Sequence, residues 1–181
     1  MRQHNVEIKA RISDFGEIGN IASEIAGGAP EVLNQVDTYF NVSRGRLKLR
    51  QYEGVCELIY YERPDTRSPK HSAYERFPVE SAEQLKRILN SAIGIRAVVC
   101  KQRFVYIYND VIIHLDTVEG LGQFLELEAV SREGISMSEC RSRVEDLLGK
   151  FKVKESDLVE VSYCDLLEQR YPNAGEQAFT R

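Results

Sequence analysis

The chain has 181 residues, of which 43% are hydrophobic and 29% are charged, and its formal net charge is -4 at pH 7. This length suits one domain with a substantial core. The negative net charge argues against general nucleic-acid binding, which needs a basic face, and no apolar run is long enough to span a membrane. The N-terminal residues do not resemble a signal peptide, and the cysteines form no C-x-x-C pair. We therefore expect a cytoplasmic protein with reduced thiols and no membrane partner.

The first half of the chain alternates apolar and polar residues in segments bounded by turn residues. A strand is predicted over 3–12, followed by a helix with Asp14 as N-cap that ends near Ala26. Further strands are then predicted over 32–42, 45–53, 55–63 and 71–79. This succession of strands is typical of a β-meander.

The second half contains helices and hairpins. A helix is predicted from Ser81 to about Gly94, and three strands follow over 96–108, 111–118 and 122–131, joined by tight turns. One more helix begins at Ser136 or Ser138, and a short helix runs from about Ser162 to Arg170. We expect a single domain over 1–171 and a flexible tail over 172–181.

Charged side chains occupy every second position in several of these strands. In the first strand Val6, Ile8 and Ala10 alternate with polar residues, so its two faces differ completely in chemistry. Cations and carboxylates occupy separate strands in the same alternating pattern. We therefore predict an α+β fold in which an eight-stranded antiparallel barrel has a polar lumen and helices packed outside. A barrel with an apolar interior is the generic alternative, but it does not explain this separation of charges.

A series of short segments carries a family resemblance. Asn5-Val6-Glu7-Ile8-Lys9 is followed by Gln35-Val36-Asp37-Thr38-Tyr39-Phe40, and further matching segments lie at 47–50, 61–64, 101–103, 114–116 and 121–128. In order and spacing they resemble the CYTH superfamily, the triphosphate tunnel metalloenzymes, and most closely its class IV adenylyl cyclase-like branch. The first segment is similar to the family's E-x-E-x-K motif, with Asn5 in the place of the first Glu.

The resemblance implies a tunnel that binds a triphosphate through inward cations and through Mg²⁺ or Mn²⁺ held by carboxylates. Fixed cations suit an enclosed polyanion, and hard divalent ions prefer oxygen ligands. The implied substrate-binding residues are Lys9, Lys48, Arg50, Arg63, Arg76, Lys101 and Arg103. The implied metal ligands are Glu7, Asp116, Glu126 and Glu128, and the implied catalytic residues are Lys9, Glu126 and Glu128. For any one carboxylate, a salt bridge with a neighbouring lumen cation is the alternative role.

Three functions follow from this resemblance. The first is metal-dependent hydrolysis of a triphosphate, which could be tripolyphosphate, a nucleoside triphosphate or thiamine triphosphate. The second is cyclisation of ATP to cyclic AMP and pyrophosphate. The third is a binding module without turnover, which is favoured if Asn5 removes a metal ligand. The family resemblance also implies a monomer or homodimer. We expect a structural hydrogen-bonding role for His114. The segment around Tyr163 resembles the family's C-terminal segment that closes one tunnel mouth, although packing alone would also explain this tyrosine.

Overall fold

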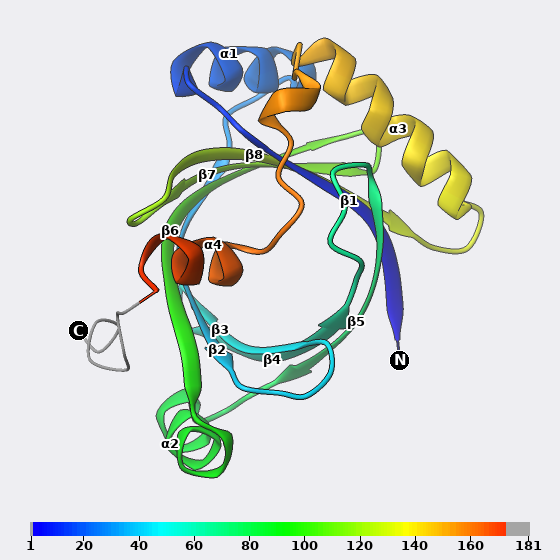
Figure 1. Ribbon diagram of the computed structural model, residues 1–181. Helices are drawn as coiled ribbons and strands as arrows, with labels where there is room; N and C mark the ends of the chain where they lie inside the picture. The colour runs from blue at the N-terminus through cyan, green and yellow to red at the C-terminus, as the bar shows by residue number, and fades with distance from the viewer. Residues whose placement is uncertain (1, 173–181) are drawn as a thin grey trace.

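The computed structural model describes residues 2–172, which form a closed barrel of eight strands (Figure 1). The strands are β1 (Gln3–Arg11), β2 (Glu31–Phe40), β3 (Arg46–Tyr52), β4 (Val55–Glu62), β5 (Lys70–Pro78), β6 (Ile95–Tyr108), β7 (Val111–Val118) and β8 (Gly122–Ser131). Around the barrel their order is β1-β5-β4-β3-β2-β6-β7-β8, and neighbouring strands are antiparallel. The predicted antiparallel barrel is confirmed. β1 closes it by pairing with both β5 and β8.

The helices begin at the capping residues that the sequence predicts. They are α1 (Phe15–Ala26), α2 (Ala82–Ile93), α3 (Met137–Lys150) and α4 (Tyr163–Arg170), with an unpredicted 3₁₀ turn at Glu155–Asp157. The side chain of Asp14 accepts a hydrogen bond from the Glu17 backbone, and Gly27 ends α1 with φ at 73°. Ser136 and Glu139 form a capping box, so Ser136 rather than Ser138 is the N-cap of α3.

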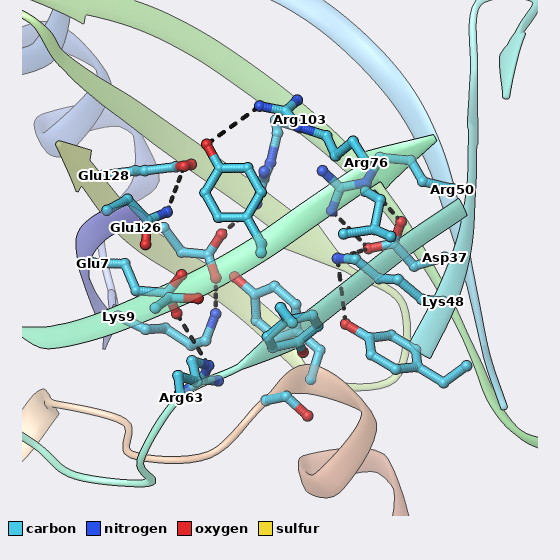
Figure 2. Close-up of a pocket in the computed structure, with 18 of the residues that line it drawn as sticks. Glu7, Lys9, Asp37, Lys48, Arg50, Arg63, Arg76, Arg103, Glu126 and Glu128 are labelled. Atoms are coloured by element: carbon cyan, nitrogen blue, oxygen red, sulfur yellow. Dashed lines mark hydrogen bonds and ion pairs between the residues drawn. The ribbon is translucent and has the colours of Figure 1, made fainter. Parts of the chain in front are cut away.

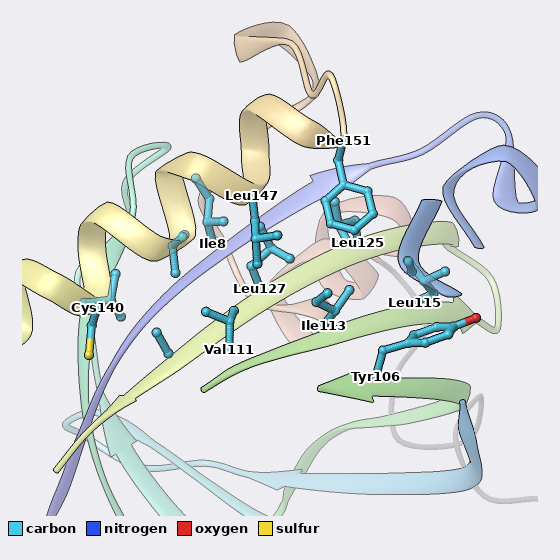
Figure 3. Close-up of a cluster of buried hydrophobic side chains, with 14 residues drawn as sticks. Ile8, Tyr106, Val111, Ile113, Leu115, Leu125, Leu127, Cys140, Leu147 and Phe151 are labelled. Atoms are coloured by element: carbon cyan, nitrogen blue, oxygen red, sulfur yellow. The ribbon is translucent and has the colours of Figure 1, made fainter. Parts of the chain in front are cut away.

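The apolar faces of the strands lie on the outside of the barrel, under two of the helices (Figure 3). Ile8 from β1 and Leu127 from β8 are buried in one cluster with Leu147 from α3. Burying a side chain of this size contributes about 1.5–3 kcal/mol. Because successive side chains of a strand point to opposite faces, this packing turns the charged positions of the same strands into the lumen.

α4 packs into one end of the barrel, inside the ring of strands in Figure 1. Its residues Tyr163 and Leu167 are buried in a second apolar cluster with Phe124 of β8. The chain leading into α4 is also held, because the Val159 backbone donates to the Lys9 carbonyl at 2.8 Å. Lys70 donates to the carbonyls of Val159 at 3.2 Å and Glu160 at 2.7 Å.

Three further sequence expectations concern the cysteines, membrane spans and the C-terminal tail. All four cysteines are free thiols, and Cys140 and Cys164 are buried. Across residues 2–172, no helix combines the length and the apolar character needed to cross a membrane. Apart from Pro172, the flexible tail expected over 172–181 lies outside the described residues.

Candidate functional site

A polar cavity of about 130 Å³ occupies the lumen of the barrel (Figure 2). Its charged lining comes from β1, β2, β3, β5, β6 and β8, from Arg63 just after β4, and Tyr163 of α4 completes it. Asn5, Glu7 and Lys9 all line it, as expected for residues two apart on one strand. With the exception of Asp116, the structure places every predicted site residue in this lining: Glu7, Lys9, Lys48, Arg50, Arg63, Arg76, Lys101, Arg103, Glu126 and Glu128.

On the β2–β3 side, one carboxylate joins two of the predicted phosphate ligands. Asp37 lies directly opposite Arg50 in the strand register. Arg50 donates from Nε to Oδ1 at 2.8 Å and from Nη2 to Oδ2 at 2.9 Å, and Lys48 Nζ donates to Oδ2 at 2.9 Å. Burial alone would raise the pKa of the Asp37 carboxyl, but Arg50 and Lys48 hold it well below its usual range. Asp37 is therefore ionised, and it anchors two lumen cations.

On the β6–β7 side, Asp116 is buried behind the cavity wall. Arg103 contacts both of its oxygens, at 2.7 and 2.6 Å, and Lys101 donates to Oδ2 at 3.2 Å. Tyr163 donates its hydroxyl to the same oxygen at 2.9 Å. Burial acts to raise the pKa of Asp116, but Arg103 and Lys101 lower it well below its ordinary value. The cations and Tyr163 thus occupy both oxygens of Asp116, whose role as a metal ligand stays a prediction.

On the β1–β8 side, three predicted metal ligands lie together. Glu7 and Glu128 are directly opposite each other in the register. Glu7 pairs with Arg63 at 3.1 Å, and Glu126 pairs with both Lys9 and Arg103. Figure 2 shows Glu7, Glu126, Glu128 and Lys9 on one side of the cavity, away from Asp37.

Lys9 is surrounded by both charges and an aromatic ring. Its Nζ lies 3.7 Å from the centre of the Tyr163 ring. Burial, with the positive charges of Arg63 and Lys101, lowers the pKa of Lys9 well below its usual value. A bound anion would oppose this shift and stabilise the protonated amine.

Arg76 differs from the other cavity cations. Its Nη2 lies 3.5 Å from the Tyr74 hydroxyl, and it forms no salt bridge with any carboxylate within residues 2–172. Arg76 is therefore free to bind an anion without first breaking a salt bridge.

The oxygen groups around Glu128 fit a hard divalent cation. Like charges directly opposite each other, such as Glu7 and Glu128, are destabilising without a cation between them. Asn5 donates Nδ2 to Glu128 at 2.6 Å, which leaves its buried Oδ1 without a hydrogen-bond partner in the described residues. Carboxylate and amide oxygens are ligands that Mg²⁺ and Mn²⁺ accept. No three acidic, His or Cys side chains within residues 2–172 form a preassembled metal cluster, and salt bridges hold Glu7 and Glu126. A metal would have to displace these cations.

His114 is buried beside this group. Its Nε2 lies 3.6 Å from Glu128, and neither ring nitrogen has a hydrogen-bond partner within residues 2–172. Burial, followed by the charge of Arg103, lowers the pKa of His114 to about 4. The imidazole is therefore neutral near pH 7. The hydrogen-bonding role expected for His114 is not found among these contacts.

The sequence patterns pointed to no role for Asp37 or Lys70. Asp37 shares its strand face with Gln35 and Tyr39, and this alternation is the signal that could have placed its side chain in the lumen. Lys70 opens β5 after a loop, where the alternation is blurred. Its contacts are the carbonyls that precede α4, which no local pattern reveals.

The comparisons with known proteins agree with this geometry. The CYTH domain model matches residues 3–163. Adenylate cyclase CyaB of Aeromonas hydrophila is 25% identical over 176 residues, which cover 91% of this chain and 88% of that protein.

Solved structures share the barrel. The PH1012 protein of Pyrococcus horikoshii is 26% identical with a TM-score of 0.77, covering 90% of this chain and 98% of its own. A candidate adenylyl cyclase from Hippeastrum, described as having a dominant triphosphatase activity, is 12% identical with a TM-score of 0.62. That match covers 98% of this chain and 100% of the other, and it shows the fold alone.

Proposed function

Because the chain belongs to the CYTH domain family, we propose that it is a metal-dependent enzyme that hydrolyses a triphosphate inside the barrel. The observation that carries this proposal is the cavity itself, where cations from four strands and Arg63 surround one space, and Glu7, Glu126 and Glu128 gather on one side of it. Such an arrangement suits a polyanion with a hard cation at one end.

The lumen cations would have two roles, substrate binding and stabilisation of the transition state. Arg50 and Arg76 would bind phosphate oxygens, since guanidinium groups grip two oxygens at once, and the Lys48 ammonium group would add a further positive charge beside them. Lys9, Lys101 and Arg103 would neutralise charge that develops on the phosphates in the transition state. Because these side chains are held in place before the substrate binds, little reorganisation accompanies the reaction.

A divalent ion fits beside this group. Glu7, Glu126, Glu128 and the free oxygen of Asn5 would hold it, and Asp116 stays a further ligand implied by the family. When bound, Mg²⁺ or Mn²⁺ would polarise a phosphoryl group as a Lewis acid. Lys9, which contacts Glu126 and the Tyr163 ring, would help to compensate the phosphate charge.

A second candidate function is ATP cyclisation. It is favoured by the likeness to adenylate cyclase CyaB over 91% of the chain. Hydrolysis stands first because water is a smaller nucleophile that needs no ribose placement, and because the Hippeastrum protein is described as mainly a triphosphatase. We expect the enzyme to act in the cytoplasm as a monomer or homodimer.

Product analysis tests the proposal. Purified protein is incubated with tripolyphosphate, with thiamine triphosphate and with ATP, each with Mg²⁺ or Mn²⁺. Release of orthophosphate supports hydrolysis, whereas cyclic AMP with pyrophosphate supports the cyclase. Tight binding without any product would identify a binding module. The double variant Lys48→Met/Arg50→Gln should lose affinity, and Arg141→Gln on the exposed side of α3 is the matched control.

A further inference from the structure

Asp37 presents a problem for a cavity that receives a polyanion. It lines the cavity and is only 1% exposed. An ionised carboxylate at this position repels a triphosphate. Its presence in the cavity therefore needs an explanation other than substrate contact. It also lies on the opposite side of the cavity from Glu7, Glu126 and Glu128, so it cannot join their metal site (Figure 2).

The hydrogen bonds of Asp37 suggest that it holds neighbouring cations in place. Both of its oxygens are used by Arg50, and Oδ2 also accepts from Lys48 at 2.9 Å and from Gln35 at 3.2 Å. The β2–β3 register sets Asp37 directly across from Arg50. This paired geometry removes the rotational freedom of two long side chains, so that their ordering costs no further entropy when the substrate binds.

The charges around Lys48 give the carboxylate a second effect. Lys48 faces Arg50 on its own strand, Asp37 and Tyr39 on β2, Tyr61 on β4, and the charge of Arg103 on β6. Burial, followed by Arg50, lowers the pKa of Lys48 to about 8, and Asp37 is the neighbour that raises it. Without Asp37, the pKa of Lys48 would fall further, as expected for a buried amine among cations.

We propose that Asp37 is a positioning residue that holds Lys48 and Arg50 aimed into the lumen as a phosphate clamp before the substrate binds. The inference rests on the proposed function. It makes a distinctive prediction about sign. If Asp37 acted only by its charge, removing that charge would tighten the binding of a polyanion. If Asp37 holds Lys48 and Arg50 in place, removing it weakens the binding.

The test is the affinity of Asp37→Asn for tripolyphosphate, measured by calorimetry without metal, together with KM and kcat. Asparagine keeps the shape of the side chain. We expect binding to weaken by about tenfold at about pH 7, where Lys48 is protonated in the wild type but loses much of its proton in the variant. The effect should be smaller at about pH 9, above the wild-type pKa of about 8, where the amine is largely neutral in both proteins. KM should rise by a larger factor than kcat falls. Glu57→Gln is the matched control, because Glu57 is the other register neighbour of Arg50 but lies outside the cavity.

A second variant separates this role from a loss of folding. In Asp37→Asn/Lys48→Met the buried charge is balanced again, so the double variant should fold as judged by its melting curve. If Asp37 acts through Lys48, the Asp37→Asn substitution should reduce triphosphate affinity by a smaller factor when it is added to Lys48→Met than when it is added to the wild type. Unchanged or tighter binding by Asp37→Asn would overturn the inference. If the wild type bound no triphosphate, the proposed function itself would fail.

Discussion

The hydroxyl of Tyr163 lies 2.9 Å from Oδ2 of Asp116, so the first residue of α4 contacts a fully buried carboxylate of β7. The same ring lies over Lys9. The helix that closes one end of the barrel is therefore joined to the charged lumen by a hydrogen bond and a cation–π contact.

Removing the Tyr163 hydroxyl should lower stability only modestly. In Tyr163→Phe, Asp116 keeps Arg103 and Lys101, so the free energy of unfolding should fall by about 1 kcal/mol. Urea denaturation measures it. Tyr52→Phe serves as the control, since that hydroxyl has no hydrogen bond within residues 2–172. Equal stability of Tyr163→Phe and the wild type would show that this hydrogen bond contributes nothing.

Arg76→Gln should weaken triphosphate binding without affecting the fold. Arg76 has no carboxylate partner within the described residues, so its loss removes a charge-assisted contact of about 1.5–3 kcal/mol and leaves no buried charge behind. Arg103→Gln should instead lower the melting temperature, because it leaves Asp116 with less compensation. Calorimetry with tripolyphosphate and thermal melts distinguish the two. A large drop in the melting temperature of Arg76→Gln would contradict this assignment.

Glu126→Gln and Glu128→Gln should each reduce Mn²⁺ binding and metal-dependent turnover while the barrel stays folded. Each substitution replaces an anionic oxygen with a neutral one at the same place. Binding is measured directly by titrating Mn²⁺ into the protein without substrate. Glu145→Gln on the exposed part of α3 is the control. If either variant binds Mn²⁺ as tightly as the wild type, the glutamate replaced in that variant is not a metal ligand.

Asn5→Glu should tighten divalent-metal binding. The Asn5 amide nitrogen is already used by Glu128, and its free oxygen is the group that a carboxylate would replace. An anionic oxygen binds a hard cation more strongly than an amide oxygen does. Mn²⁺ titrations of binding and of turnover should both shift to lower concentrations. Weaker triphosphate affinity with unchanged metal binding would instead mean that the Asn5 NH₂ group contacts phosphate.

The attachment of α4 should weaken in acid. Burial acts to raise the pKa of Asp165, but hydrogen bonds from Ser162 and the charge of Arg46 lower it to about 2. A depressed carboxylate pKa stabilises the fold above the ordinary value of 3.8, and this contribution is lost as the pH falls towards about 2. The stability difference between the wild type and Asp165→Asn should therefore shrink across this range in acid titrations of unfolding. A difference that does not change with pH would refute an ionic role.

Much of the barrel is predictable because its determinants are local. The alternation of Val6, Ile8 and Ala10 with Asn5, Glu7 and Lys9 identifies a strand with two distinct faces, whichever strand pairs with it. Capping residues such as Asp14 and Ser136 act within one turn of the helices that they begin. The polar lumen and the apolar outer face follow from these local patterns.

The tertiary structure alone determined which cation pairs with which carboxylate. Alternation shows the face on which a side chain lies, but the register of paired strands selects its neighbours. Asp37 is opposite Arg50, whereas Asp116 is opposite Arg103 and lies behind the cavity wall. Tyr163 reaches both Asp116 and Lys9 from a helix far away in the sequence. Burial makes these long-range pairs strong, because in a medium of low dielectric constant each ion depends on its nearest partner.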